Sequence, residues 1–201
     1  MKKLIAMLLT LTMVAALFAG CAGNTDAPAD DNNATETTGT SVNVTADATT
    51  VLTNIWAAFG EDEKFSIRGG NIENGVENEP AAFNLEYAEN LTYELLVPAD
   101  QVANVAEAAC MMHGMNVNNM TIGVFKLVDG ADRDAFIQAM YTAIQTNPYM
   151  CGFPDEMLIA VIDGTYVLAG FGSTDAMSLV KANLAEAYPA AEILYDEAIT
   201  G

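Results

Sequence analysis

Basic side chains are scarce in this sequence of 201 residues, in which seven Lys and Arg stand against 27 Asp and Glu and the formal net charge is −20. Proteins that bind nucleic acid use clustered Lys and Arg to neutralise phosphates. The shortage therefore excludes nucleic acid as a partner, and anionic lipid headgroups should repel the chain as well. We interpret the acidity as a source of solubility; attraction of cations or basic partners is the alternative.

Histidine is limited to one residue and cysteine to three. Any Ser or Cys nucleophile that relies on a histidine base would have to use His113, and on a strand the nearby Cys110 would point to the opposite face. Carboxylate pairs for glycoside cleavage stay open, because 27 acids make pairs inevitable and a sequence gives no separation between them. The sequence does not favour an enzyme, and it predicts no cofactor.

Only one long apolar run is present. It extends from Leu4 to Ala19, follows Lys2 and Lys3, and is interrupted by Thr10 and Thr12. A positive start before a short apolar segment is typical of a signal peptide. The run is slightly short for a membrane span, which needs about 20 apolar residues.

The run ends in Leu17-Phe18-Ala19-Gly20-Cys21. This segment resembles the lipobox of bacterial lipoproteins, except that Phe18 stands where leucine is commonest. In those proteins the leader is cleaved before the cysteine, whose thiol carries a diacylglycerol. The resemblance implies a signal peptide over residues 1–20, lipidation of Cys21, and an anchor of two or three acyl chains on the outer face of the cytoplasmic membrane. Ordinary secretion or an uncleaved anchor is the alternative.

Residues 21–49 contain almost no large apolar side chain. Such a segment cannot bury enough surface to fold, so we expect a disordered tether that holds the domain about 30 Å from the bilayer. Residues 50–201 match one domain in size. Cleavage of the leader would remove two basic residues and no acid, which leaves five basic against 27 acidic side chains and a net charge near −22.

Lipidation of Cys21 would leave Cys110 and Cys151 as the only pair of cysteines. Exported proteins can keep disulfides, and a bridge between these two would stabilise the fold by roughly 3–4 kcal/mol through the entropy of the unfolded chain. Two buried free thiols that pack as small apolar groups are the alternative. The sequence therefore predicts a possible disulfide between Cys110 and Cys151.

Apolar residues recur with a helical period from Asp47 to Gly60, from Ala131 to Thr146 and from Ser173 to Pro189. Between Met157–Ile162 and Thr165–Phe171, the dipeptide Asp163-Gly164 predicts a two-residue hairpin turn. Apolar runs rich in β-branched residues predict strands at Phe65–Arg68, Met120–Val128, Met157–Ile162, Thr165–Phe171 and Ile193–Tyr195.

Two segments are less regular. Alternating apolar residues between Phe83 and Leu95 predict one or two strands. Between Gln101 and Met115 a helix and a buried strand at Ala106 to Met112 both fit, and periodicity alone does not decide. From Met120 onward the order is strand, helix, strand, strand, helix, strand, which resembles a ferredoxin-like split unit. We expect an α+β domain with a small antiparallel sheet and helices packed on one face.

Several of these segments together resemble one family. Ile122-Gly123-Val124-Phe125-Lys126 precedes a helix that ends near Gln145, and Pro154-Asp155-Glu156 precedes the hairpin at Asp163. The pattern is similar to that of the domain-of-unknown-function 4358 family of Gram-positive bacterial lipoproteins, over about Leu91 to Phe171 plus the following helix. Asn119-Met120 departs from it, because an acidic residue is common there. The resemblance implies a strand at Ala106 to Met112 and implies no activity.

One local composition is unusual, because soft ligand types gather in a single run. Thiolate, thioether and imidazole together suit Cu(I), although Met also fills irregular cores and a lone histidine is usually structural. We favour packing and keep a soft-metal site as the alternative. The candidate ligands are Cys110, Met111, Met112, His113 and Met115.

The sequence thus predicts a membrane-anchored extracellular lipoprotein that acts as a binding or accessory protein of the cell envelope. Its expected partners are the membrane, through the lipid anchor, and an envelope protein or wall component. One alternative function is a copper-binding lipoprotein, and another is a cell-wall hydrolase or its inhibitor.

Overall fold

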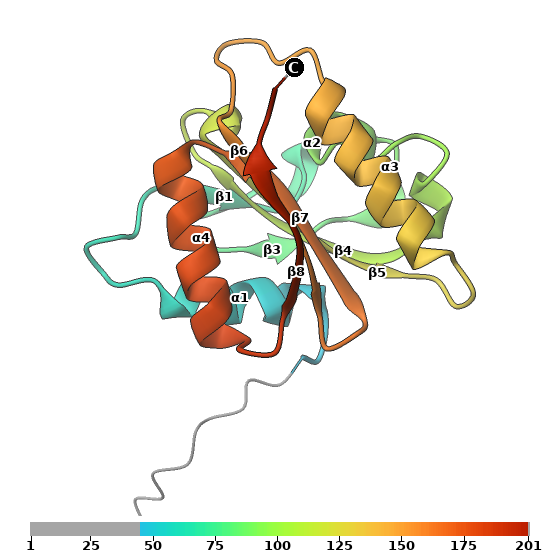
Figure 1. The fold of residues 1–201 in the computed structure, drawn as a ribbon, viewed down its shortest axis with the longest axis horizontal. Coiled ribbons are helices and arrows are strands. Elements are labelled where there is room, and N and C mark those ends of the chain that lie inside the picture. The colour runs from blue at the N-terminus through green and yellow to red at the C-terminus, as the bar shows by residue number, and fades with distance from the viewer. Residues whose placement is uncertain (1–44, 201) are drawn as a thin grey trace, which may run out of the picture. The chain divides into compact units, whose positions relative to one another are not determined.

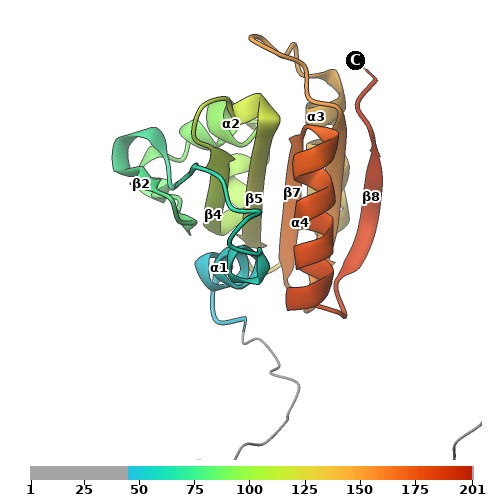
Figure 2. The ribbon, with the colours of Figure 1, turned by 90° about the vertical axis from the view of Figure 1, so that its left-hand side faces the viewer.

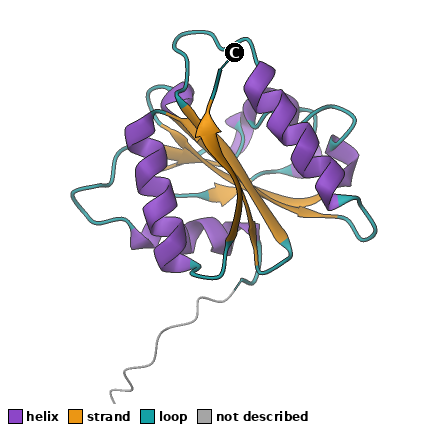
Figure 3. Ribbon diagram, viewed as in Figure 1, coloured by secondary structure: helices purple, strands orange, loops and turns teal. Residues whose placement is uncertain are grey.

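The computed structural model describes residues 45–200, so the expected signal peptide, Cys21 and most of the expected tether lie outside the described residues. Within residues 45–200, eight strands form one antiparallel sheet and four α-helices pack on it, so the predicted α+β class is confirmed (Figures 1 and 3). None of these helices combines the length and apolarity that crossing a membrane requires.

The helices are α1 (Ala48–Ala58), α2 (Asn90–Glu94), α3 (Arg133–Thr146) and α4 (Thr174–Ala187). The strands are β1 (Ile67–Gly69), β2 (Val76–Glu77), β3 (Ala81–Ala82), β4 (Val105–His113), β5 (Met120–Leu127), β6 (Glu156–Ile162), β7 (Tyr166–Gly172) and β8 (Glu192–Ala198). They are arranged across the sheet in the order β2-β1-β4-β5-β7-β6-β8, and β3 also pairs with β4.

Local signals in the sequence fix the starts of three helices. Asp47, Asp132 and Ser173 are the N-caps of α1, α3 and α4, and each side chain accepts a hydrogen bond from the backbone N–H three residues on. Such a cap satisfies a free N–H group of the first turn and contributes about 1 kcal/mol. A hairpin forms at Asp163-Gly164 as predicted, with left-handed φ angles of 48° and 65° at these two residues. Its loop is one residue longer than the two expected, because Ile162 pairs with Tyr166 and leaves Thr165 in the turn.

The strands expected between Phe83 and Leu95 are wrong. A 3-10 turn at Leu85–Tyr87 and helix α2 occupy this region instead. Leu91 and Leu95 are four residues apart, so a helix places them on one face, where both are buried, whereas Tyr93 is 79% exposed. Two residues four positions apart lie on the same face of a strand and also on the same face of an α-helix. Here the burial of both leucines in the core favours the helix.

The ambiguous segment before Met115 is strand β4, in agreement with the strand that the family resemblance implies. The strand lies inside the sheet, with β5 on one side and β1 and β3 on the other. Residues 108–112 are all buried. A strand covered on both faces has a continuous apolar run rather than an alternating one, which is why the sequence pattern resembled a helix as well.

Helices cover both faces of the sheet, so the expectation that they pack on one face is wrong. On one face α1 and α4 pack against side chains such as Met111, Ile122 and Leu168. On the other face α2 and α3 pack against Met112, Phe125 and others. Figure 2 shows α4 in front of β7 with α3 behind it.

The reason lies in the position of β8. The order of elements from β5 to β8 is the one expected, but β4 occupies the free edge of β5, and β8 pairs with β6 instead. The crossovers from β5 to β6 and from β7 to β8 therefore step in the same direction across the sheet, while β5 and β7 run antiparallel. Crossovers of the same hand then place α3 and α4 on opposite faces.

Candidate functional site

Two loops meet at one end of the sheet, and we call them the two-loop tip, residues 114–119 and 147–154. The first loop joins β4 to β5, and the second joins α3 to β6. Met120 at the start of β5 and Glu156 at the start of β6 both pair with Gly172 of β7, so both loops leave the sheet at the same row. The second loop is the orange segment at the top of Figure 1.

Asparagine side chains connect the two loops. Asn118 Nδ2 donates to the carbonyl oxygens of Met150 and Gly152 at 2.6 and 2.8 Å, and Asn116 Nδ2 donates to the carbonyl oxygen of Cys151 at 3.3 Å. Carbonyl groups outside regular structure need such partners when they are not solvated. The bonds hold the backbone of the second loop against the first.

Four large apolar side chains of the tip are exposed to solvent. The exposed fraction is 90% for Met115, 81% for Met150, 53% for Phe153 and 46% for Val117. Residues 114–119 and 147–154 contain no Asp, Glu, Lys or Arg, although these residues make up 17% of the chain, and the first charge comes at Asp155, the last residue before β6. Exposed apolar clusters of this kind mark surfaces that bind other molecules, so the tip is the candidate site.

Tyr149 anchors the second loop to the core. Its ring packs against Phe171 at a centroid distance of 5.2 Å and against Phe153 at 5.4 Å. Its hydroxyl donates to the carbonyl oxygen of Ile144 at 2.9 Å. Burial raises the pKa of Tyr149 above its ordinary value, so the phenol stays protonated. Phe153 is thereby held at the surface against a ring that is itself fixed.

Acidic side chains border the tip. Asp155 is the last residue before β6, Glu156 is the first residue of β6, Asp175 lies in the first turn of α4, and Glu197 is near the end of β8. Asp155 accepts a hydrogen bond from the first backbone N–H of α4 at 3.1 Å, which brings that turn to the same end of the sheet. The amine of Lys181 lies 3.5 Å from Glu156 and compensates part of this charge. The tip is therefore an uncharged surface with an acidic border.

The chain enters the described residues at the far end of the sheet. Thr45 Oγ1 donates to Asp163 Oδ2 at 2.6 Å, and Asp163 lies in the turn after β6, whereas the tip precedes β6. A strand of seven residues spans about 20 Å. The tip therefore faces away from the point at which the N-terminal segment joins the domain.

The structure does not join the two cysteines considered for a disulfide, and both are free. Cys110 is buried in β4, where its Sγ donates to the carbonyl oxygen of Gly70 at 3.4 Å. Loss of solvation raises the pKa of the Cys110 thiol to about 12. Cys151 is exposed on the tip. The predicted disulfide is wrong because both thiols are free, and the alternative of two buried thiols is wrong because only Cys110 is buried.

The five soft-ligand candidates do not converge. Alternation along β4 places Cys110 and Met112 on one face of the sheet and Met111 on the other. The Nδ1 atom of His113 accepts hydrogen bonds from the backbone N–H groups that follow it, at 3.2 and 3.3 Å, and Met115 lies out on the tip. Within residues 45–200, no three or more His, Cys, Asp or Glu side chains group so that they could hold a metal ion.

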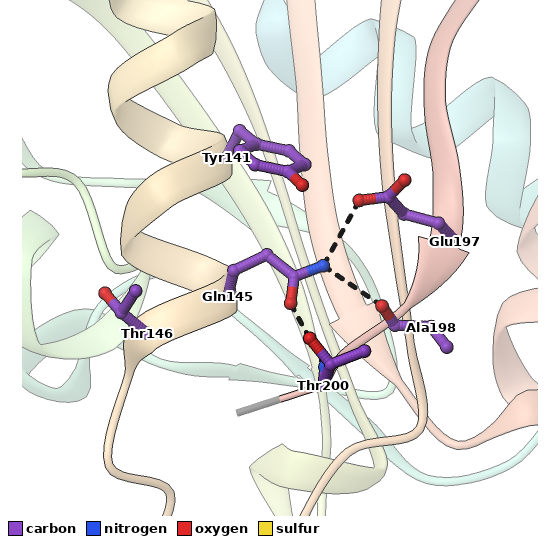
Figure 4. Close-up of a pocket in the computed structure, with 6 residues that line it drawn as sticks. All are labelled: Tyr141, Gln145, Thr146, Glu197, Ala198 and Thr200. Atoms are coloured by element: carbon purple, nitrogen blue, oxygen red, sulfur yellow. Dashed lines mark hydrogen bonds between the residues drawn. The ribbon is translucent and has the colours of Figure 1, made fainter.

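A groove of about 540 Å³ lies between α3 and β8 and is the second candidate (Figure 4). Gln145 Nε2 donates to Glu197 Oε1 at 3.2 Å and to the carbonyl oxygen of Ala198 at 3.0 Å, and Gln145 Oε1 accepts from the backbone N–H of Thr200 at 3.1 Å. The side-chain amide of Gln145 thus binds the carbonyl group of Ala198 and the N–H group of Thr200, which another strand would otherwise bind at the β8 edge of the sheet. Hydrogen bonding to Glu197 raises the pKa of Tyr141. These polar groups already bind one another, and we interpret the groove as structural.

Comparisons with protein-family models, with curated proteins and with solved structures found no match. The lipobox at Cys21 and the resemblance to the 4358 family therefore stay predictions from the residues that carry them.

Sequence reasoning did not find the two-loop tip. It considered Met115 only as a metal ligand and Cys151 only as a disulfide partner. A signal was nevertheless present, because residues 114–119 and 147–154 are rich in Met, Asn and aromatic residues and contain no charge in a highly acidic chain. Their meeting depends on the sheet order, which the sequence did not provide.

Proposed function

We propose that this chain is a lipid-anchored binding protein of the bacterial cell envelope, which holds a protein partner at the two-loop tip. The anchor rests on the lipobox resemblance at Cys21, and membership in the 4358 family of Gram-positive lipoproteins is part of the same proposal. The observation that supports binding is the exposed apolar tip, free of charge, on a chain of net charge −20.

The acidic border of the tip selects among possible occupants. A second copy of this chain would bring two acidic borders together, and anionic lipid headgroups would be repelled in the same way. A protein surface with an apolar centre and a rim of Lys or Arg complements both parts of the tip. We therefore take the partner to be an envelope protein with such a surface.

Neither alternative function gains a specific observation. The soft ligands of a copper site diverge, and the buried Cys110 is a protonated thiol rather than a nucleophile. An inhibitor of a cell-wall hydrolase would be one form of the partner binding proposed, with the hydrolase as the partner.

Photo-crosslinking tests the location of the binding surface. A photoreactive amino acid is placed at Val117 on the tip and, in a matched control, at Ile193 near the opposite end of the sheet, because both side chains are 46% exposed. The full-length protein is irradiated in intact membranes and the products are identified by mass spectrometry. We expect one defined protein product from position 117. Equal products from both positions, or a product only from position 193, would contradict the proposal.

The partner identified in this way is then purified and its affinity measured. Replacement of Met115, Met150 and Phe153 by Ser should weaken binding at least about ten-fold, because apolar anchors dominate interface energies. The control carries Val128→Ser and Ile193→Ser, both at exposed positions away from the tip. Higher salt should weaken the wild-type complex if the rim contacts are ionic. An equal loss of affinity in the control would show that the tip is not the binding surface.

A further inference from the structure

We propose that Met115 and Met150 are modification sites for two-electron oxidants of the peroxide and hypohalous acid class, and that their oxidation switches off binding at the two-loop tip. The binding consequence rests on the proposed function, whereas the choice of residues rests on the structure alone.

The methionines of the described residues fall into two groups by exposure. Met115 and Met150 are 90% and 81% exposed. The other six are no more than 1% exposed, and they are Met111, Met112, Met120, Met140, Met157 and Met177. A thioether reacts with a dissolved oxidant only where the oxidant can reach the sulfur, so exposure decides which methionines react. Both reactive methionines thus lie on the same small surface.

The reaction is the transfer of one oxygen atom. With hydrogen peroxide, the sulfur lone pair attacks one peroxide oxygen, the O–O bond breaks, and methionine sulfoxide and water are formed. The sulfur loses two electrons and the peroxide gains them. With hypochlorous acid the leaving group is chloride. The product is polar and can be reduced again by methionine sulfoxide reductases.

The tip is sensitive to this change because of its composition. Two of its four exposed large apolar side chains, Met115 and Met150, are thioethers, and residues 114–119 and 147–154 contain no charged side chain, so the only ionic contacts that remain after oxidation are those of the acidic border. Conversion of both thioethers to sulfoxides replaces about half of the apolar contact by polar groups that a partner would have to desolvate. The oxidised tip therefore loses affinity without unfolding of the domain, because the six buried methionines of the core are protected.

The first experiment needs no partner. The purified full-length protein is treated with hydrogen peroxide, sampled over time, and digested for peptide mass spectrometry. Met115 and Met150 should gain oxygen at least about ten-fold faster than the six buried methionines. Retention on a phenyl resin should fall as they are oxidised and recover after treatment with both sulfoxide reductases. Dithiothreitol is added to every sample after oxidation, because it reverses disulfide and sulfenic acid at Cys151 but leaves sulfoxides. Equal oxidation of the eight methionines within residues 45–200 would overturn the proposal.

The second experiment measures crosslinking from position 117 in membranes before peroxide, after peroxide, and after reductase treatment. We expect about a ten-fold loss of product and its recovery by the reductases. An unchanged yield after oxidation of both residues would overturn the switch and leave the proposed function intact. Absence of a crosslink from the untreated protein would overturn the proposed function, and the switch with it, while selective oxidation in the first experiment would still establish the two modification sites.

Discussion

Met111 in β4 and Met115 in the loop that follows are the same side chain four residues apart, yet they are 0% and 90% exposed. The two cysteines within residues 45–200 differ in the same way, because Cys110 is buried in β4 and Cys151 is exposed on the two-loop tip. Strand β4 is covered by helices on both faces, whereas the tip lies beyond the last paired row of the sheet. Met and Cys side chains are therefore buried in β4 and exposed at the two-loop tip. Their position in the fold determines their exposure.

Truncation of the two methionines should give the largest difference between these regions. Met111→Ala removes a fully buried side chain and should lower the free energy of unfolding by about 2–5 kcal/mol. Met115→Ala should change it by no more than about 0.5 kcal/mol, because the side chain lies in solvent. Urea denaturation followed by circular dichroism measures both. Similar decreases in the free energy of unfolding for the two variants would contradict the difference in burial between these positions.

The buried thiol should make stability depend on pH in the alkaline range. The ordinary pKa of Cys110 is 9.0 and burial raises it to about 12, so the folded state keeps the proton that the unfolded state loses. Stability from this group is complete below pH 9 and is lost as the pH rises toward 12, with a slope of up to about 1.4 kcal/mol per pH unit. Cys110→Ala should show a shallower fall, which denaturation at several pH values would detect. Buried tyrosines contribute the same slope to both proteins, so equal slopes would argue against a protonated buried thiol.

Alkylation by iodoacetamide tests the difference in exposure between the thiols of Cys110 and Cys151. At pH 8 the exposed Cys151 should react at least about a hundred-fold faster than Cys110, because reaction needs both access and thiolate. Addition of urea above the unfolding midpoint should make the two rates similar. Peptide mass spectrometry assigns the label. Rapid labelling of Cys110 in the folded protein would mean that β4 opens to solvent.

The smallest expected effect concerns the bonds that hold the tip in place. Asn118→Ala removes two hydrogen bonds, to the carbonyl oxygens of Met150 and Gly152, and should lower the free energy of unfolding by about 1–2 kcal/mol. Hydrogen exchange should become faster in residues 149–152 and remain unchanged in β6. Asn104→Ala is a control, because its side-chain partner, Gln101, lies outside the tip. Faster exchange throughout the sheet would indicate a general loss of stability instead.

The predictable part of the fold is the part governed by neighbouring residues. Caps at Asp47, Asp132 and Ser173 and the turn at Asp163-Gly164 act over three or four positions, so their sequence signals are sufficient. The segment between Phe83 and Leu95 was misassigned because Leu91 and Leu95 fit either period. Of the candidate site, Met115 and Cys151 were identified in the sequence, each for a different role.

Composition and short-range periodicity are sufficient to specify the acidic charge, the α+β class, the three long helices and the central hairpin. Tertiary structure alone decided that β8 pairs with β6, that helices cover both faces, and that the loops around Met115 and Met150 meet. These features depend on which strand edges remain free after other strands have paired, and that is a property of segments far apart in the chain. The exposure of a methionine or a thiol follows from the same pairing, so no local pattern of residues could have assigned it.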